Sequence, residues 1–267
     1  LRGVGKPQMI QPSNNLFYMA GQKNPTMQKI LNACFDGIKS THKIAGYIEP
    51  FTGTGNVLLH RPEKLEHEFL NDNSADLVNL LLILRDYPQE LKIELWKQDF
   101  SKSAFERSRT LLEKNFRFKD HRSALIQRAA AFYFVRYASH YGNGSSYRAS
   151  ITRSKYQRKL DSIGMISKRL QHVDMKKRNA LYYCDILAAV YGNLIYFDPP
   201  YIGSEYYYRI NNQKGNVFSS HTALRNRIEQ LRKKNICVLS YRTTASATMK
   251  QHGITDEYVR HTLNRLF

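Results

Sequence analysis

The chain has 267 residues, 42% of them hydrophobic, which is enough for a globular protein of one large domain or two small ones. It holds 41 Lys and Arg against 22 Asp and Glu, a formal net charge of +19, and a surplus of this size favours a polyanionic partner: DNA, RNA or an acidic membrane. No apolar run approaches the roughly 18 residues that cross a bilayer, and residues 1–15 lack the apolar core of a signal peptide.

Strand and helix signals alternate in the first part of the chain. Residues 44–48, IAGYI, predict a strand, and the run EPFTGTGNVLL after it predicts a sharp turn into a helix. Residues 67–71, HEFLN, predict a second strand. A helix follows over residues 74–86 with Ser74 as its N-cap, and Pro88 ends or kinks it.

From about residue 89 to 177 helical patterns dominate, interrupted by the polar stretch SHYGNGSSYRASITRSKYQRK, and many basic residues lie here. Strand signals return at 180–185, 193–198 and 235–241, with a helix over 222–234 before the last of them. Strand and helix in alternation imply parallel pairing through right-handed crossovers. The sequence therefore predicts an α/β sheet that carries an inserted helical subdomain.

The turn after the first strand has a glycine pattern. Gly53 and Gly55 allow positive φ and close approach of a ligand to the backbone, and the helix that follows offers free N–H groups. The third glycine of G-x-G-x-x-G is missing, and the carboxylate of Glu49 would repel a pyrophosphate. An acidic residue here suits a cationic ligand, and S-adenosylmethionine fits through its sulfonium and amino groups.

Asp72 ends the second strand, about 20 residues past the glycine turn, where nucleotide-binding folds place an acid that binds ribose hydroxyls. The alternative is a residue that caps the helix after it. Beside the glycine turn, ribose binding is the favoured interpretation.

The stretch Asp198-Pro199-Pro200-Tyr201 follows the strongest predicted strand. Proline cannot continue a sheet ladder, so the strand stops abruptly and holds a carboxylate and an aromatic ring at its end. The exocyclic N6 of adenine is a poor nucleophile because its lone pair is delocalised into the ring. Two acceptors, the Asp198 carboxylate and the Pro199 carbonyl, could draw that lone pair back onto nitrogen, while Tyr201 stacks on the base. The alternative is an ordinary turn with an Asp cap.

Taken together, these motifs resemble the Dam-like, alpha-class DNA adenine-N6 methyltransferases. IEPFTGTGNVLL resembles the family's cofactor loop, LNDNSADLVNL its ribose-binding segment, IYFDPPY its catalytic motif, and LFYMAGQK its N-terminal lysine motif, in the family's order. The resemblance implies a Rossmann-like S-adenosylmethionine-dependent methyltransferase sheet with an inserted helical target-recognition subdomain. It also implies transfer of a methyl group to N6 of an adenine flipped out of a specific double-stranded DNA sequence, with no metal.

Carried over by position, the resemblance assigns site residues. Cofactor binding falls on Lys23, Glu49, Phe51, Gly53, Gly55 and Asp72, and Asp185 is expected near the cofactor's adenine or amino group, with a solvent-facing strand end as the equal alternative. The target adenine falls to Asp198, Pro199, Pro200 and Tyr201. Contacts to DNA are expected from a cluster on or near one polar loop, with a solvated basic loop as the alternative: Arg136, Tyr137, Tyr141, Asn143, Arg148, Arg153 and Lys155.

The implied organisation is a flexible basic arm over 1–15, a methyltransferase domain from 16–88 and 178–267, and a DNA target-recognition insertion over 89–177. Cysteines 34, 184 and 237 lie far apart without C-x-x-C spacing, which predicts reduced thiols, no zinc site and a cytoplasmic protein. The resemblance implies that the protein is bacterial or phage-encoded. An RNA or protein methyltransferase that uses DPPY and a non-catalytic nucleic-acid-binding relative are the alternatives. The sequence leaves open the target sequence, a partner endonuclease of a restriction-modification pair, and a monomer or a weak dimer.

Overall fold

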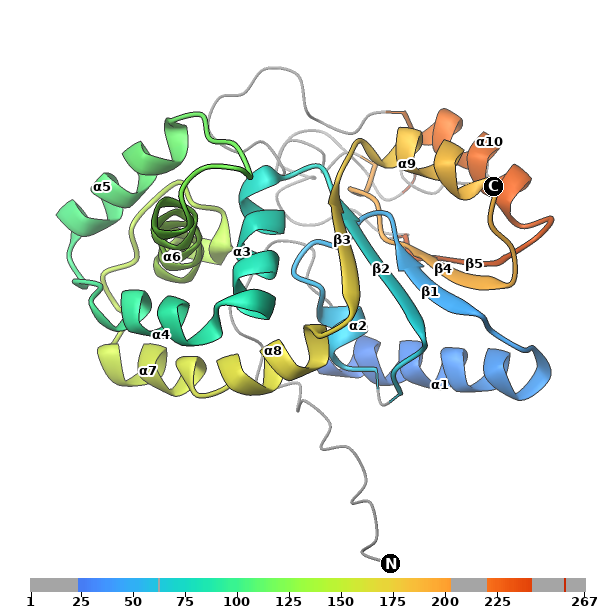
Figure 1. The fold of residues 1–267 in the computed structure, drawn as a ribbon, viewed down its shortest axis with the longest axis horizontal. Coiled ribbons are helices and arrows are strands. Elements are labelled where there is room, and N and C mark those ends of the chain that lie inside the picture. Colours follow the sequence, from blue (N-terminus) through green and yellow to red (C-terminus); the bar gives the residue numbers. More distant parts are fainter. Residues whose placement is uncertain (1–23, 62, 203–219, 242–256, 258–267) are drawn as a thin grey trace, which may run out of the picture. The chain divides into compact units, whose positions relative to one another are not determined.

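The structure, a computed structural model, describes residues 24–61, 63–202, 220–241 and 257, and these divide into two compact units (Figure 1). The helical unit draws on 1–43, 53–66 and 79–173, and the sheet unit draws on 44–52, 67–78 and 174–267. Lys23 and the expected arm over 1–15 lie outside the described residues. The domain boundaries drawn from the sequence stay predictions.

The sheet unit is built on five strands in the described part of the chain, in the order β3-β2-β1-β4-β5. Their bounds are β1 Gly46–Glu49, β2 His67–Asp72, β3 Val173–Lys177, β4 Asn193–Phe197 and β5 Ile236–Leu239. The pairs β1–β2, β1–β4 and β4–β5 are parallel. From β1 the strand order continues outward through β2 to β3, and from β4 it continues outward on the other side to β5. The β1–β4 pair is therefore a topological switch point.

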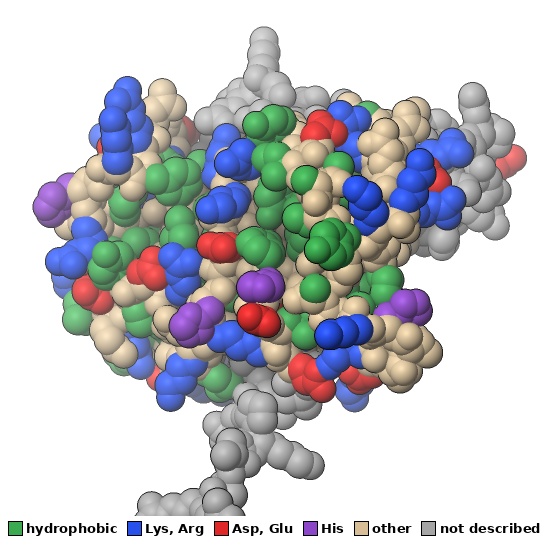
Figure 2. All heavy atoms as spheres, turned by 45° about the vertical axis from the view of Figure 1, so that its right-hand side comes forward, with side chains coloured by type: hydrophobic (Ala, Val, Ile, Leu, Met, Phe, Trp, Pro, Cys, Tyr) green, Lys and Arg blue, Asp and Glu red, His purple; other side chains and the backbone are tan. Residues whose placement is uncertain are grey.

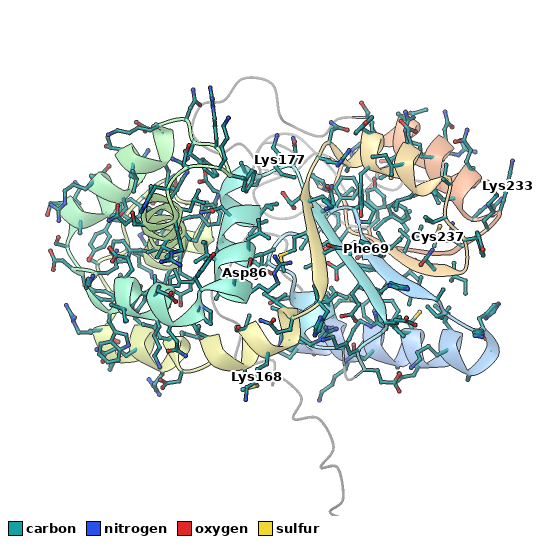
Figure 3. The ribbon with its side chains drawn as sticks, viewed as in Figure 1. Phe69, Asp86, Lys168, Lys177, Lys233 and Cys237 are labelled. Carbon is teal, nitrogen blue, oxygen red and sulfur yellow. The ribbon has the colours of Figure 1, made fainter. Side chains whose placement is uncertain are left out.

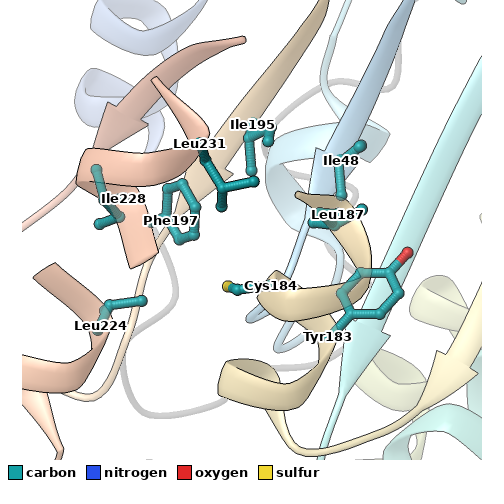
Figure 4. Close-up of a cluster of buried hydrophobic side chains, with 9 residues drawn as sticks. All are labelled: Ile48, Tyr183, Cys184, Leu187, Ile195, Phe197, Leu224, Ile228 and Leu231. Atoms are coloured by element: carbon teal, nitrogen blue, oxygen red, sulfur yellow. The ribbon is translucent and has the colours of Figure 1, made fainter. Parts of the chain in front are cut away.

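One face of this sheet is covered by α9 (Ala180–Leu187) and α10 (His221–Leu231). Three groups of buried side chains meet there (Figure 4): Ile48, Ile195 and Phe197 from the strands, Tyr183, Cys184 and Leu187 from α9, and Leu224, Ile228 and Leu231 from α10. All five residues of β4 are buried, as expected for a strand covered on both faces. Each of the larger side chains contributes roughly 1.5–3 kcal/mol to folding by leaving water.

The helical unit holds most of the helices. They are α1 Pro25–Thr41, α2 Asn56–Leu59, α4 Pro88–Trp96, α5 Lys102–Glu113, α6 Arg122–Ala138, the short 3-10 helix His140–Gly142, α7 Arg153–Leu160 and α8 Ile163–Leu170, while α3 Ala75–Asp86 passes from the sheet unit into this one. Helix α6 is buried nearly all round from Ala129 to Val135, and it packs against α4 and α5. A helix that is apolar on all sides is typical of a core position, so α6 is the centre of this unit.

Most strands and helices expected from the sequence are confirmed, with two corrections. The expected strand over 180–185 is wrong, because these residues form α9. The side chain of Asn179 accepts hydrogen bonds from the backbone N–H groups of Leu181 and Tyr182, which caps a helix, and Tyr183, Cys184 and Leu187 then face the core together. The strand that the sequence reading missed is β3, whose residues VDMKK bury only Val173 and Met175.

The cysteines are free thiols, as predicted. Burial raises the pKa of Cys184 to about 12, with a further contribution from the nearby Asp185 carboxylate, and burial also raises the pKa of Cys237 to about 12. Both thiols therefore stay protonated at neutral pH and behave as small core side chains.

A candidate active site at the carboxyl ends of the strands

Three carboxylates come together at one edge of the sheet unit. Because β2, β1 and β4 are parallel neighbours, they end at the same edge, and there they carry Asp72, Glu49 and Asp198. Strands lie about 4.8 Å apart, so the three side chains are spread over roughly 10 Å. This edge includes the topological switch point between β1 and β4, where open α/β sheets bind their ligands.

The pairing register also places these carboxylates on one face of the sheet. Glu49 pairs with Leu70, and Ile48 pairs with Ile195, so Asp72 and Asp198 each lie two residues beyond the level of Glu49. Side chains alternate along a strand, and Ile48 points to the α9 and α10 core. The carboxylates therefore lie toward the opposite face.

Glu49 is buried, with 1% of its surface exposed. Its Oε1 accepts a hydrogen bond from the hydroxyl of Tyr47 at 2.9 Å. The turn after it is held by Thr52, whose Oγ1 donates to the carbonyl of Glu49 at 3.1 Å and whose N–H donates to the carbonyl of Asn71 at 2.9 Å. A carboxylate in such a place is costly to desolvate and is suited to a polar, cationic ligand.

The glycines of the loop have the backbone geometry that the sequence predicts. Gly53 has φ +53° and Gly55 has φ +70°, which lie in the left-handed region that favours glycine. Gly55 is also the N-cap residue of α2. Phe51, on the same loop, is half-buried and packs against the core cluster of the sheet unit.

Asn71, which was not predicted as a site residue, links the segment after β1 to the segment after β3 through its side chain. Its Nδ2 donates to the carbonyl of Pro50 at 3.0 Å and to the carbonyl of Arg178 at 3.1 Å. The side chain is buried, and its Oδ1 has no hydrogen-bond partner within the described part of the chain. No local signal in β2 singles it out, because both of its side-chain hydrogen bonds reach segments far away in the sequence. A buried acceptor without a partner fits a place where a ligand's donor arrives.

Asp72 Oδ1 accepts the backbone N–H of Ser74 at 2.8 Å, which forms a tight turn just before α3. The helix itself is capped by Ser74, as the sequence predicts, since its Oγ accepts the N–H of Leu77 at 3.3 Å. Ribose binding by Asp72 stays a prediction. A carboxylate has about four acceptor positions, so this bond does not exhaust its capacity.

The Asp-Pro-Pro-Tyr stretch follows β4 directly. Asp198 Oδ1 accepts a hydrogen bond from the hydroxyl of Tyr201 at 3.2 Å, which closes the turn on itself. The N–H of Ser240 donates to the carbonyl of Phe197 at 2.9 Å and fixes the end of β4 to the end of β5. Burial raises the pKa of Tyr196, and the negative charge of Asp198 raises it further, so this phenol stays neutral beside the carboxylate.

Asp185 does not lie at a strand end. It is on α9, half exposed, and its carboxylate pairs with the guanidinium of Arg227 on α10, with 3.0 Å between Nε and Oδ1 and 3.1 Å between Nη2 and Oδ2. The predicted strand position is corrected here because the segment is helical. The residue two beyond the end of β3, whose last residue Lys177 is labelled in Figure 3, is Asn179.

In the helical unit, the residues expected to contact DNA gather around the loop after α6. Arg136 is buried, its guanidinium lies 5.1 Å from the Phe132 ring centroid, and its Nη1 donates to the carbonyl of Gly142 at 2.9 Å. Arg148 donates from Nη2 to the carbonyl of Tyr137 at 3.2 Å. Both arginines therefore stabilise the loop through hydrogen bonds to backbone carbonyls. Arg136 is buried and does not have the surface position that we expected.

The other members of the expected DNA-contact cluster differ in exposure. Asn143 Oδ1 accepts from the N–H and the hydroxyl of Ser145 at 2.9 and 2.8 Å, and Tyr137 packs on Tyr156 with ring centroids 5.0 Å apart. Arg153 and Lys155 are exposed in the first turn of α7. The side chain of Tyr141 lies outside the described residues. Lys and Arg outnumber Asp and Glu on the face that Figure 2 draws.

Two searches of the described part of the chain give negative results. Its His, Cys, Asp and Glu side chains form no group of three or more that could hold a metal ion. None of its helices is both long and apolar enough to cross a membrane.

Comparison with known proteins adds one match. The model of a family described as D12 class N6 adenine-specific DNA methyltransferase matches residues 20–264. A search of the curated proteins finds no match.

Proposed function

The chain belongs to the D12 class N6 adenine-specific DNA methyltransferase family and is therefore a DNA adenine methyltransferase, and we propose that its methyl donor is S-adenosylmethionine and its acceptor an adenine flipped out of a specific duplex sequence. The observation that carries the proposal is the pairing of two strand ends at the switch point. One strand ends in the buried Glu49, and its neighbour is followed by Asp198-Pro199-Pro200-Tyr201.

Asp198 and Pro199 are proposed to accept hydrogen bonds from the two N–H bonds of the target amine. The two acceptors pull the nitrogen lone pair out of the ring, and they act best when they are preorganised. Asp198 accepts a hydrogen bond from Tyr201, which holds the carboxylate in one orientation, and a carboxylate has about four acceptor positions in all. Pro200 keeps the turn rigid, and the Tyr201 ring offers a stacking surface for the base.

The acidic edge fits S-adenosylmethionine, which would supply an electrophilic methyl group on a positively charged sulfur. Glu49 would face its cationic part, Asp72 its ribose hydroxyls, and the unpartnered Oδ1 of Asn71 an additional donor. Lys23, Phe51, Gly53 and Gly55 are proposed as cofactor residues from the sequence motif alone. Asp185 leaves this set because its carboxylate pairs with Arg227.

Contacts to DNA are proposed for the members of the helical unit's cluster other than the buried Arg136. An adenine inside a duplex presents N6 in the stack, so the enzyme must swing the base out before it can react. Arg153 and Lys155 are placed to meet phosphate, and Asn143 and Arg148 belong to the loop that would approach the bases. Tyr137 and Tyr141 remain candidates to fill the gap that the base leaves.

The proposal is tested by transfer of labelled methyl from S-adenosylmethionine to unmethylated duplex DNA, followed by nucleoside analysis. We expect the label in N6-methyladenine of DNA. Equal amounts of RNA and of a protein mixture serve as competing acceptors in the same assay. Label that appears in either of these and not in DNA contradicts the proposed acceptor and favours the alternative methyltransferase classes.

The role of Glu49 predicts a specific loss of cofactor binding. Glu49→Gln keeps an oxygen that can accept from Tyr47 but removes the charge, so the dissociation constant for S-adenosylmethionine should rise about tenfold to a hundredfold, as a lost charge-assisted hydrogen bond implies. Titration calorimetry measures the change. The matched control is Glu68→Gln, since Glu68 is also buried but lies inside β2, opposite Tyr47. Equal losses in both variants would count against a direct role for Glu49.

A further inference from the structure

A chain of side-chain contacts in the sheet unit leads from the start of α10 to Asp198. His221 is the first residue of α10, and its Nδ1 lies 2.5 Å from the hydroxyl oxygen of Tyr241. The Tyr241 ring centroid lies 6.1 Å from that of Tyr201, with 41° between the planes. Tyr201 in turn donates its hydroxyl hydrogen to Asp198 at 3.2 Å. Neither the helix nor β5 belongs to the motifs that pointed to the site.

Both ends of this series of contacts have fixed positions in the sheet unit, one through a backbone hydrogen bond and the other through core packing. The N–H of Ser240 donates to the carbonyl of Phe197, so the segment that carries Tyr241 is joined to the residue just before Asp198. Helix α10 is anchored in the core by Leu224, Ile228 and Leu231. His221 therefore has a fixed position on the helix, and Tyr241 has a fixed position on the strand end.

The hydrogen bond between His221 and Tyr241 has a consequence for Tyr201. A tyrosine ring held at its hydroxyl cannot swing about its side-chain torsions without losing that bond, and His221 is buried, with 8% of its surface exposed. The Tyr241 ring therefore has a fixed position beside Tyr201. The Tyr241 ring on one side and the hydrogen bond to Asp198 on the other confine Tyr201 to one orientation.

We propose that His221 and Tyr241 are positioning residues for methyl transfer, which hold Tyr201, and through it Asp198, in the geometry that grips the target adenine. The inference rests on the proposed function, because it uses the roles given there to Asp198 and Tyr201. His221 and Tyr241 act through Tyr201 and need not touch the reacting atoms.

The test is a double-mutant cycle on the single-turnover rate of methyl transfer to genomic DNA that lacks N6-methyladenine. His221→Ala and Tyr241→Phe should each lower this rate about tenfold. The double variant should be no slower than the slower single one, since both changes break the same link. His221→Asn, which keeps a hydrogen-bonding group near the position of Nδ1, should recover most of the rate.

A merely structural role would affect other quantities. We expect the KM for DNA, the dissociation constant for S-adenosylmethionine and the Tm of each variant to stay close to those of the wild type. Tyr191→Phe is the matched control, since Tyr191 is 76% exposed in the same unit, and its rate should be unchanged. Tyr241→Phe keeps the ring, so it tests the link even if His221→Ala fails to fold.

Two results would overturn the inference. Rate losses that multiply in the double variant show that the two residues act independently, and variant rates equal to the wild-type rate show that the link does not matter. Wild-type enzyme that puts no methyl into DNA adenine overturns the proposed function itself, and this inference with it. An active wild type with unaffected variants overturns the positioning role alone.

Discussion

Asp198→Ala is expected to lower the rate of methyl transfer to DNA about a thousandfold, the effect of removing one preorganised electrostatic group from an active site. The carboxylate is one of the two acceptors proposed to activate the amine, and the Pro199 carbonyl cannot act alone on both N–H bonds. Asp198→Asn keeps the shape and one oxygen but removes the charge, so it should retain more activity than the alanine variant. Labelled methyl transfer under single-turnover conditions measures both.

DNA affinity and folding separate this effect from damage to the protein. Asp198 follows a strand and is not part of the buried core, so we expect Tm and DNA binding to stay near the wild-type values. Asp174→Asn, an exposed carboxylate on β3, is the control for a general loss of negative charge in the sheet unit. Methyl transfer by Asp198→Ala at the wild-type rate would remove Asp198 from the mechanism.

The affinity for duplex DNA is expected to fall about a thousandfold between 50 and 200 mM salt. A protein that neutralises roughly six phosphates releases a matching number of counterions, and the logarithm of the binding constant then falls steeply with the logarithm of the salt concentration. The formal net charge of +19 makes such a number of contacts reasonable. Fluorescence anisotropy with a labelled duplex at several salt concentrations gives the slope.

Matched pairs of charge removals locate the contacts. Replacing Arg153 and Lys155 with Ala should reduce the slope by about two, close to one for each lost phosphate contact. Removing Lys233 and Lys234, two exposed residues just after α10, is the control and should leave the slope unchanged. A flat salt response of the wild type would contradict phosphate contacts as the main source of affinity.

The parts of the fold that sequence predicts well are those in which local pattern and burial agree. Strand β4 is a continuous apolar run with prolines after it, and it is buried throughout. Strand β3 is the opposite case, because VDMKK buries only alternate residues and looks like the polar end of the preceding helix. Helix α9 contains strand formers in LYYC, and only its Asn179 cap and its packing on the core decide the outcome.

The residues of the candidate site also fall into those that local sequence predicts and those that it does not. Glu49, Asp72 and Asp198 follow predicted strands directly, so parallel pairing alone brings them to one edge. Asn71 and the link from His221 to Tyr241 depend on contacts between segments far apart in the chain, which no local pattern encodes. Arg136 shows the limit of reasoning from charge, since its guanidinium is buried and donates to a backbone carbonyl inside the helical unit.

The row of carboxylates at the sheet edge has the opposite sign to the protein as a whole. At long range the excess of Lys and Arg draws a polyanion toward the surface. Within a Debye length of the edge, about 8 Å in physiological salt, Glu49, Asp72 and Asp198 repel phosphate. The basic surface and the acidic sheet edge therefore act differently on the phosphates and on the bases of DNA. If the proposed function holds, the charged backbone stays on the basic surface, and an uncharged base is the part of DNA that enters beside the cationic cofactor.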